Sequence, residues 1–594
     1  MIFGKHINKY YLKYSWLLLI GIAALFVIDS FQLRIPGIYN MVVTALNTGN
    51  VVINGQEVPF TMDILLDKIC LPMLFIVLGL LVGRFAWRIC FFGSAIMVAK
   101  DMRGEMFDHC KDLSQQFYNV NKVGDLMSLF TNDLDTIEDC FGSGILMFAD
   151  ALFLGVLAII RMAGMHIYLT LLALIPLVFL FILSTVVGKS MMKKWDKRQE
   201  QFSKLSDFSQ ESFSGIAVIK AFVRETHELL AFKKLNSDNE EANVSYVRTA
   251  TWLRVLVTLF EESVVGVILG YGGYLVYKNV FTAGDLIEFI GYFTAIIWPI
   301  MAIAELIDMT SRGKASLSRI GKLLEEKPDV VDAAGVTDMD VIRGDIEFRD
   351  LTFSYPGANH DNLKNVSFKI NAGENVGIIG KTGSGKTTLC DLVLRTYNVP
   401  DGTLFIDGRD INTIPIKTVR QYAAYVPQDG FLFSDTISEN IAFASDTNEI
   451  DRVKRAAEIA GVIDDINEFP EGFETVLGER GVTVSGGQKQ RISIARAVMK
   501  DASILIMDDS VSAVDTATEK KILGELRTLR QGRTTILIAH RVSSIEQMDK
   551  IIFMEGGRVT GVGTHRELIE SCPSYARTVE LQKLEDEKDG DINA

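Results

Sequence analysis

The sequence of 594 residues contains only six cysteines and seven histidines. The cysteines lie far apart, without CxxC or any other regular spacing, so we expect neither a disulfide framework nor a zinc site. Strongly basic blocks are also missing, because Lys and Arg total 60 against 74 Asp and Glu, a formal net charge of −14. Nucleic acid is therefore not an expected partner.

Long apolar runs, by contrast, fill the first half of the chain. A transmembrane helix needs roughly 20 mostly apolar residues, since a rise of about 1.5 Å per residue must cross about 30 Å of hydrocarbon. Six segments satisfy this requirement, at residues 16–38, 69–97, 140–163, 167–187, 252–277 and 286–309. They predict an all-α transmembrane domain of six helices in a lipid bilayer.

Basic residues indicate how this domain is oriented. The first loop, residues 40–67, contains no Lys or Arg, whereas a group of basic residues between 193 and 224 follows the fourth apolar segment. Because basic loops stay on the cytoplasmic side of a membrane, we expect both termini to be cytoplasmic.

Two connections between the apolar segments are unusually long, at residues 100–139 and 188–251. They are polar with helical periodicity, which predicts helices that extend into the cytosol. Each contains a turn-like break beside a short amphipathic piece, near 119–129 and near 211–222, suited to docking on a cytoplasmic domain. The alternative is a folded loop without a coupling role.

Several ionisable residues fall inside the apolar segments, where hydrocarbon makes them costly unless they face water or the bundle interior. They are Asp29, Arg84, Arg88, Asp150, Glu261, Glu262, Glu288 and Glu305. Glu261 and Glu262 lie near mid-depth of the fifth segment and about 100° apart around a helix. We take them as a candidate substrate cavity for lipophilic cations, with one lining it and the other paired with an arginine. The alternative is helix–helix pairing or an interfacial position.

Beyond a charged connector, the composition changes to short β-branched runs that alternate with helical patterns. This pattern indicates an α/β domain. We place the transmembrane domain at 1–312, the linker at 313–343, the α/β domain at 344–580 and an acidic tail at 581–594.

A phosphate-binding loop follows the apolar run 375–379. The sequence GKTGSGKTT at 380–388 matches G-x-x-x-x-G-K-[ST] between a predicted strand and a predicted helix. Its glycines let backbone N–H groups approach phosphates, its lysine reaches the outer phosphates, and the threonine after it offers a hydroxyl to Mg²⁺. The predicted nucleotide-binding residues of this loop are Gly380, Gly383, Ser384, Gly385, Lys386, Thr387 and Thr388.

A carboxylate that suits Mg²⁺ bound to ATP ends the predicted strand 503–507. This residue is Asp508, and its neighbour is Asp509. Around these elements the sequence resembles ATP-binding cassette (ABC) transporters. VSGGQ at 484–488 resembles the LSGGQ signature, and SAVD at 512–515 resembles the D-loop.

Three single residues add to the resemblance. Gln428 in YVPQD resembles the Q-loop glutamine, His540 in LIAHR the H-loop histidine, and Tyr355 in FSYPG the aromatic residue that stacks on adenine. Six spans followed by one cassette is the layout of exporter-type (type IV) half-transporters, so the resemblance covers the whole chain.

The resemblance implies ATP and Mg²⁺ as cofactors, with the metal near Thr387, Gln428 and Asp508. It also implies a dimer in which each ATP lies between the Walker motifs of one chain and the signature of the other. The helix that begins at the signature offers an anion site, and only one P-loop is present, so a second chain is required. The residues implied to contact the partner's ATP are Ser485, Gly486, Gly487, Gln488 and Asp515.

Asp509 departs from the family pattern, which usually places Glu there as the general base. Asp is one methylene shorter, so its carboxylate stops ~1.5 Å short, and a misplacement of about 1 Å can cost on the order of a hundredfold in rate. The resemblance then implies the degenerate subunit of a heterodimeric exporter, with Asp509, His540 and Gln428 as its catalytic set. The alternative is a backbone shift that restores hydrolysis. Val484 in place of Leu is an apolar exchange with little expected effect.

The sequence thus predicts a subunit of an ATP-driven exporter that moves small amphipathic molecules (drug-like, lipid or peptide) by alternating access. We expect it in a bacterial plasma membrane with a second half-transporter chain as its partner. Three alternatives remain: a homodimeric exporter that uses Asp509 as its base, an exporter-fold importer of the siderophore type, and an ATP-gated channel or regulator. ATPase activity of the chain alone, flux direction and uphill flux distinguish them.

Overall fold

The computed structural model describes residues 3–53, 56–445, 447–478, 484–512 and 514–592. The chain divides into two compact units, the first comprising Met1–Cys110 and Gly124–Glu325 and the second Lys111–Val123 and Glu326–Ala594. The short segment Lys111–Val123 therefore packs with the second unit, although it lies in the first half of the sequence.

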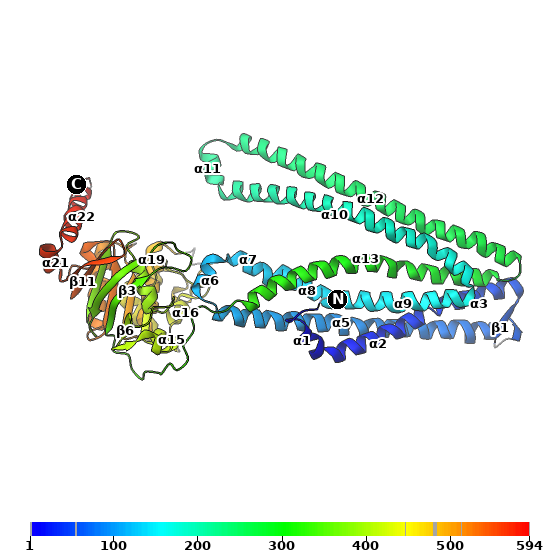
Figure 1. Ribbon diagram of the computed structural model, residues 1–594, viewed down its shortest axis with the longest axis horizontal. Coiled ribbons are helices and arrows are strands. Elements are labelled where there is room, and N and C mark those ends of the chain that lie inside the picture. Colours follow the sequence, from blue (N-terminus) through cyan, green and yellow to red (C-terminus); the bar gives the residue numbers. More distant parts are fainter. Residues whose placement is uncertain (1–2, 54–55, 446, 479–483, 513, 593–594) are drawn as a thin grey trace. The chain divides into compact units, whose positions relative to one another are not determined.

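Long helices build the first unit (Figure 1). The six predicted apolar segments fall on α2 (Ser15–Gln32) with α3 (Ile35–Thr48), α5 (Leu71–Asp112), α9 (Ser143–Met165), α10 (Ile167–Ser214), α12 (Glu225–Tyr277) and α13 (Ala283–Glu325). Among the described residues, four stretches are long and apolar enough to cross a membrane, and a shorter apolar stretch is Ile167–Pro176. The four are Ser15–Thr48, Met62–Asp112, Val123–Met165 and Ala283–Glu325. The count of six spans stays a prediction.

Short elements connect these helices. Helices α10 and α12 form an antiparallel pair joined by α11 (Ile216–Ala221), in keeping with the long helices predicted for 188–251 (Figure 1). The remaining elements of the first unit are α1 (Asn8–Lys13), β1 (Asn50–Ile53), β2 (Gln56–Pro59), α4 (Met62–Ile64), η1 (Leu65–Cys70), α7 (Val123–Ser128), η2 (Leu129–Asp133) and α8 (Leu134–Phe141).

Large apolar side chains cover much of the helix surface in this unit. On α5, Leu74 is 55% exposed, Phe75 63% and Val82 66%. Such a surface is unfavourable in water and suits contact with lipid tails. The helices of the first unit therefore have the surface of membrane spans.

Helix α13 continues past residue 312, the predicted end of the transmembrane domain, to Glu325. Its last turns bury Leu317, Ile320 and Leu323 at helical spacing, interspersed with charged residues such as Arg319 and Lys322. The first unit ends at Glu325, inside the predicted linker. The charged composition concealed an amphipathic stripe that keeps this segment helical.

The second unit is an α/β domain with two sheets. In the six-stranded sheet the order is β12-β11-β5-β10-β9-β8, with β12 antiparallel to β11 and the other neighbours parallel. These strands are β5 (Asn375–Gly380), β8 (Ala423–Val426), β9 (Ile504–Asp508), β10 (Thr534–Ala539), β11 (Lys550–Glu555) and β12 (Arg558–Gly563). An antiparallel sheet, in the order β4-β3-β6-β7, contains β3 (Ile346–Phe353), β4 (Leu363–Ile370), β6 (Leu404–Ile406) and β7 (Arg409–Asp410).

Helices accompany both sheets. They are α6 (Gln115–Val120), α14 (Lys386–Val393), α15 (Ile416–Tyr422), α16 (Ile437–Ala442), α17 (Ile450–Ile459), α18 (Ile463–Glu468), α19 (Gly486–Met499), α20 (Thr516–Leu529), α21 (His565–Ser571) and α22 (Pro573–Ile592), with the 3₁₀ turns η3 (Ile411–Thr413), η4 (Gly472–Glu474) and η6 (Val542–Ser544). Every residue of β9 and β10 is buried, as expected for central strands of a covered parallel sheet. The predicted fold class, a helical membrane domain followed by an α/β cassette, is confirmed.

Candidate functional site

Four loops meet at one edge of the six-stranded sheet. Strands β5, β8, β9 and β10 are parallel, so their carboxyl ends lie on the same side. The P-loop follows β5, Gln428 lies two residues after β8, Asp508 ends β9 and His540 follows β10. The topology thus brings the predicted phosphate, metal and catalytic residues to one place.

The P-loop wraps around the side chain of Lys386. Its ammonium donates hydrogen bonds to the carbonyl oxygens of Gly380 at 2.8 Å and Lys381 at 3.1 Å. Gly385 has φ 95°, and a Cβ there would lie 2.7 Å from a methyl group of Leu363, so only glycine fits. Burial lowers the pKa of Lys386, while the charges of Asp508 and Asp509 oppose that effect. A phosphate would supply the counter-charge that the buried ammonium needs.

Asp508 is buried at the end of β9, and its Oδ2 atom has no hydrogen-bond partner among the described residues. Burial raises the pKa of its carboxyl group, and a hydrogen bond with Thr387 opposes the rise. An orphaned carboxylate oxygen beside a threonine hydroxyl is a donor set that suits Mg²⁺ held between protein and phosphate oxygens. The side chains present therefore fit the metal ion that the sequence implies.

The three predicted catalytic residues lie together. Gln428 Nε2 donates to Asp509 Oδ2 at 3.3 Å, and His540 Nε2 lies 4.0 Å from the same oxygen. The Asp509 backbone has φ 47°, a left-handed conformation that Asp adopts more readily than most residues. Its N–H donates to the Ile538 carbonyl at 3.0 Å, and its carbonyl accepts from the Ser512 hydroxyl at 2.9 Å. The carboxylate therefore projects from a backbone that is hydrogen-bonded on both sides.

Tyr355 lies beside the P-loop helix rather than in open solvent. Its hydroxyl and that of Thr388 are 2.9 Å apart, and it donates to Asp391 Oδ2 at 3.4 Å. Burial raises the pKa of Tyr355 to about 12 and that of Asp391 to about 6. The tyrosine thus borders the P-loop, and its stacking on adenine stays a prediction.

The signature residues open α19. Ser485 caps this helix and forms a capping box with Gln488, whose amide also donates to Asp465 at 3.0 Å. A Cβ at Gly486 would meet no atom within 4 Å, so the helix start is sterically open. Val484 is buried in the core beneath it. The first turn therefore presents backbone N–H groups where an anion can approach.

Asp515 serves its own chain as a helix cap. Its carboxylate accepts hydrogen bonds from the backbone N–H groups of Ala517 and Thr518 at the start of α20. These hydrogen bonds lower the pKa of Asp515, and the bond from the Thr518 N–H has the largest effect. Ala513 of the predicted D-loop lies outside the described residues.

Sequence reasoning missed Gln582, which lies on α22 within the predicted acidic tail. Its side-chain amide donates to the His540 carbonyl at 2.7 Å and accepts from the Val542 N–H at 2.8 Å. These two hydrogen bonds hold the backbone on either side of the H-loop. A single glutamine in a charged segment carries no signal of such a contact.

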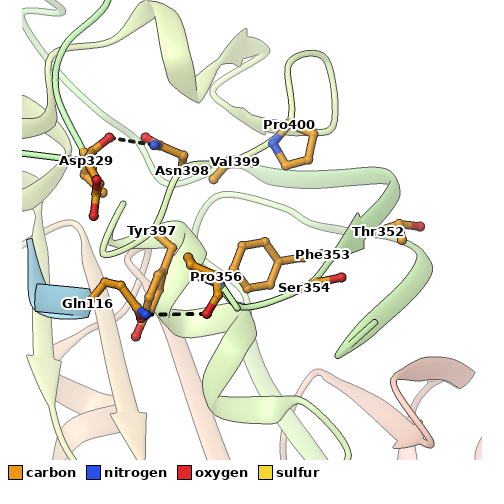
Figure 2. Close-up of a pocket in the computed structure, with 11 residues that line it drawn as sticks. Gln116, Asp329, Thr352, Phe353, Ser354, Pro356, Tyr397, Asn398, Val399 and Pro400 are labelled. Atoms are coloured by element: carbon orange, nitrogen blue, oxygen red, sulfur yellow. Dashed lines mark hydrogen bonds between the residues drawn. The ribbon is translucent and has the colours of Figure 1, made fainter. Parts of the chain in front are cut away.

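The short helix α6, which overlaps the start of the predicted docking piece 119–129, belongs to the second unit and contacts the cassette within it. Asn119 donates to the Tyr397 hydroxyl at 3.0 Å, and Tyr397 packs edge-on against Tyr355 with ring centroids 4.9 Å apart. Figure 2 shows Gln116 pointing at the Pro356 carbonyl beside Tyr397, where a cavity of about 390 Å³ opens. Contacts therefore run from α6 through two tyrosines to the P-loop helix.

Glu261 and Glu262 are both on α12, Glu261 half-buried and Glu262 exposed. No ion pair joins either carboxylate to an arginine in the described part of the chain. They are not among the residues that line the cavity between α2, α5, α9 and α13. Their role in substrate binding stays a prediction.

Comparisons with known proteins agree with this architecture. The family described as the ABC transporter transmembrane region matches residues 18–300, and the family described as ABC transporter matches residues 363–512. Both matches fall where the sequence places a membrane domain and a cassette.

Curated relatives resemble the chain over its whole length. The probable multidrug resistance ABC transporter ATP-binding/permease protein YheI of Bacillus subtilis is 36% identical, covering 100% of this chain and 99% of that protein. The multidrug resistance-like ATP-binding protein MdlA of Escherichia coli is 34% identical over 97% of this chain and 96% of its own length. A solved bacterial Atm1-family ABC exporter with ATP bound superposes with a TM-score of 0.74 at 25% identity, over 97% of this chain and 98% of that one.

Proposed function

This chain belongs to the ABC transporter family, as an exporter-type half-transporter that couples ATP hydrolysis to transport, and we propose that it is the degenerate-site subunit of a heterodimeric exporter. The observation that carries the proposal is Asp509, a short carboxylate where the family uses Glu. Its backbone is fixed by hydrogen bonds to Ile538 and Ser512, which opposes the shift that would bring the carboxylate closer to water.

The other nucleotide-binding residues support ATP and Mg²⁺ binding at this site. The P-loop from Gly380 to Thr388 would surround the phosphates, Tyr355 would border the adenine, and Thr387, Gln428 and Asp508 would hold the metal ion. Gln428 donates its side-chain N–H to Asp509, so its side-chain oxygen Oε1 would be left for the metal. The site then binds ATP well and hydrolyses it slowly.

In the proposed dimer, this chain contributes its signature helix to the ATP site of its partner. The open first turn of α19, with Ser485, Gly486, Gly487 and Gln488, completes the partner's competent site, and Asp515 lies across the same interface. Around α11, Phe213 is 75% exposed, Phe222 73% and Val223 81%, an apolar tip suited to docking on the cassette of another chain. Burial of such side chains typically contributes about 1.5–3 kcal/mol each.

The cargo in this proposal is a small amphipathic molecule, and the membrane is the bacterial plasma membrane with both termini in the cytoplasm. The relatives named for multidrug resistance are bacterial, which supports this choice. Closure of the cassette dimer around two ATP molecules drives the spans from one access state to the other, and hydrolysis at the competent site resets them.

Affinity purification of the full chain from its native membrane tests the proposal. The expected result is a second half-transporter chain, identified by mass spectrometry, in roughly equal amount. Recovery of this chain alone, with ATPase activity of its own, favours the homodimer in which Asp509 is the base. Flux into rather than out of cells favours the importer, and flux that never runs uphill favours the channel.

A further inference from the structure

A cavity of about 360 Å³ lies between α2, α5, α9 and α13 of the first unit. Its lining combines acidic, basic and aromatic side chains with apolar ones, at positions that the sequence places inside membrane spans. The polar and aromatic residues that matter here are Asp29, Gln32, Arg84, Arg88, Asp150 and Trp298. Cavities of this size hold drug-sized molecules.

Asp29 is the most deeply buried of these groups. It is only 2% exposed, it lines the cavity, and its Oδ2 atom has no hydrogen-bond partner among the described residues. Asp150 of α9 lies close enough to interact with it electrostatically. The indole N–H of Trp298 donates to Asp150 Oδ2 at 2.7 Å. Two adjacent carboxyl groups in hydrocarbon require a proton or another cation between them.

Arg84 and Arg88 do not supply that cation in this structure. Both side chains are exposed on α5, and Arg88 lies against the ring of Trp87 at 5.4 Å. Within the described part of the chain, no ion pair joins either arginine to Asp29 or Asp150. Within the described residues, the two carboxyl groups therefore line the cavity without an ion-paired arginine, although Arg84 and Arg88 border the same cavity.

We propose that Asp29 and Asp150 bind the positively charged group of the cargo, while Trp298 and the apolar wall of the cavity hold its hydrophobic body. The inference rests on the proposed function, because it names the cargo class of the exporter as lipophilic cations. An aromatic ring beside two carboxylates attracts a cation through both its π-face and their charge. It also places the cation site on α2 and α9 rather than at Glu261 and Glu262.

Equilibrium binding to the full chain in lipid nanodiscs tests this site, with its partner subunit present if one copurifies. The probes are radiolabelled tetraphenylphosphonium and tetraphenylborate, which have nearly the same size and opposite charge, and empty nanodiscs correct for partition into lipid. In the double variant Asp29→Asn, Asp150→Asn, the ratio of cation to anion affinity should fall by about tenfold or more. The control Glu305→Gln, a carboxylate on α13 outside the cavity lining, should leave the ratio unchanged.

The binding experiment has outcomes that support or overturn the assignment of the cation site to Asp29 and Asp150. A misfolded double variant would lose both probes, and the charge-conserving variant Asp29→Glu, which should keep most cation binding, then provides the test. An unchanged ratio in the double variant overturns the proposal, as does a fall that appears instead in Glu261→Gln or Glu262→Gln. Because binding is measured without ATP, a failure of export in transport assays leaves this result intact and overturns only the proposed function.

Discussion

Lys386 is the side-chain cation that the P-loop motif predicts will bind the phosphates of ATP. Its ammonium is held by two backbone carbonyls inside the P-loop, and burial makes its charge costly until an anion arrives. Lys386→Ala should weaken ATP binding at this site by about tenfold to a hundredfold, since charge-assisted hydrogen bonds contribute about 1.5–3 kcal/mol. Titration with a fluorescent ATP analogue measures the change.

The neighbouring Lys381 provides the matched control for that experiment. Its side chain is exposed, and only its backbone carbonyl contacts Lys386. Lys381→Ala should therefore leave the affinity within about twofold. Equal effects of the two substitutions would show that general positive charge, and not the P-loop geometry, attracts the nucleotide.

Gln582 holds the H-loop by hydrogen bonds to the backbone of His540 and Val542, which lie about forty residues before it in the sequence. Loss of its amide leaves the His540 carbonyl and the Val542 N–H without partners, at a typical cost of about 1–3 kcal/mol for each buried group. We expect Gln582→Ala to speed hydrogen exchange at the Val542 amide. Gln582→Glu keeps the acceptor for that amide and should preserve its protection. Slow exchange in the alanine variant would mean that the H-loop is held by other contacts.

At the scale of helices and strands, the contacts between α6 and the cassette form one continuous series. Asn119 binds the Tyr397 hydroxyl, the Tyr397 ring packs on Tyr355, and the Tyr355 hydroxyl contacts Thr388 of α14. The chain joins α6 directly to α5 and α7, which lead to membrane helices. We predict that a shift of α14 on nucleotide binding is passed to α6 through these side chains and then along the chain to α5 and α7.

Tyr397→Phe tests this series, because it keeps the ring and removes only the hydroxyl that Asn119 contacts. Basal ATPase activity should change by less than about twofold, while stimulation of ATPase by transported compounds should fall severalfold. Tyr422→Phe is the control, since the Tyr422 hydroxyl donates to the Asp340 carbonyl at 2.6 Å instead of to α6. Full stimulation in Tyr397→Phe would leave α6 without a coupling role through this contact.

The sequence predicted the main residues of the ATP site but missed the end of α13 and two contact residues. The P-loop was found by its glycine and lysine spacing and Asp508 by its place at the end of a predicted strand, whereas Asp509, Gln428 and His540 rested on the resemblance to ABC transporters. Parallel strands bring all these positions to one edge of the sheet. The extension of α13 to Glu325 escaped notice because its buried leucines and isoleucine are interspersed with polar and charged residues. Gln582 and Tyr397 escaped because single side chains that bind a distant backbone or helix leave no periodic signal.

The sequence also failed to predict which acidic residues of the membrane spans lie together. Hydropathy identified Asp29, Asp150, Glu261 and Glu262 as unusual, and adjacency along the chain drew attention to the glutamates. The cavity instead places Asp29 with Asp150, which lie on different helices and are separated by more than a hundred residues in sequence. Pairing across helices depends on tertiary packing, which a hydropathy pattern does not encode.

At the scale of the whole molecule, one chain contains one P-loop and one signature helix, so two composite ATP sites need two chains. A degenerate subunit keeps its signature residues intact because they serve the partner's site. In the proposed heterodimer, such a subunit would tolerate a shortened carboxylate at Asp509, since its own site would have only to bind ATP and close the dimer. Both features are present in this sequence.

The central claim is that Asp509 is not a working general base, and steady-state ATP hydrolysis by the complete transporter tests it most directly. The substitution is Asp509→Asn, which keeps the size of the side chain and removes its charge. The account predicts a modest change, within about threefold, because turnover takes place at the partner's site. A fall of about a thousandfold, the scale for losing an essential catalytic group, would contradict it and make Asp509 the base of a homodimeric exporter.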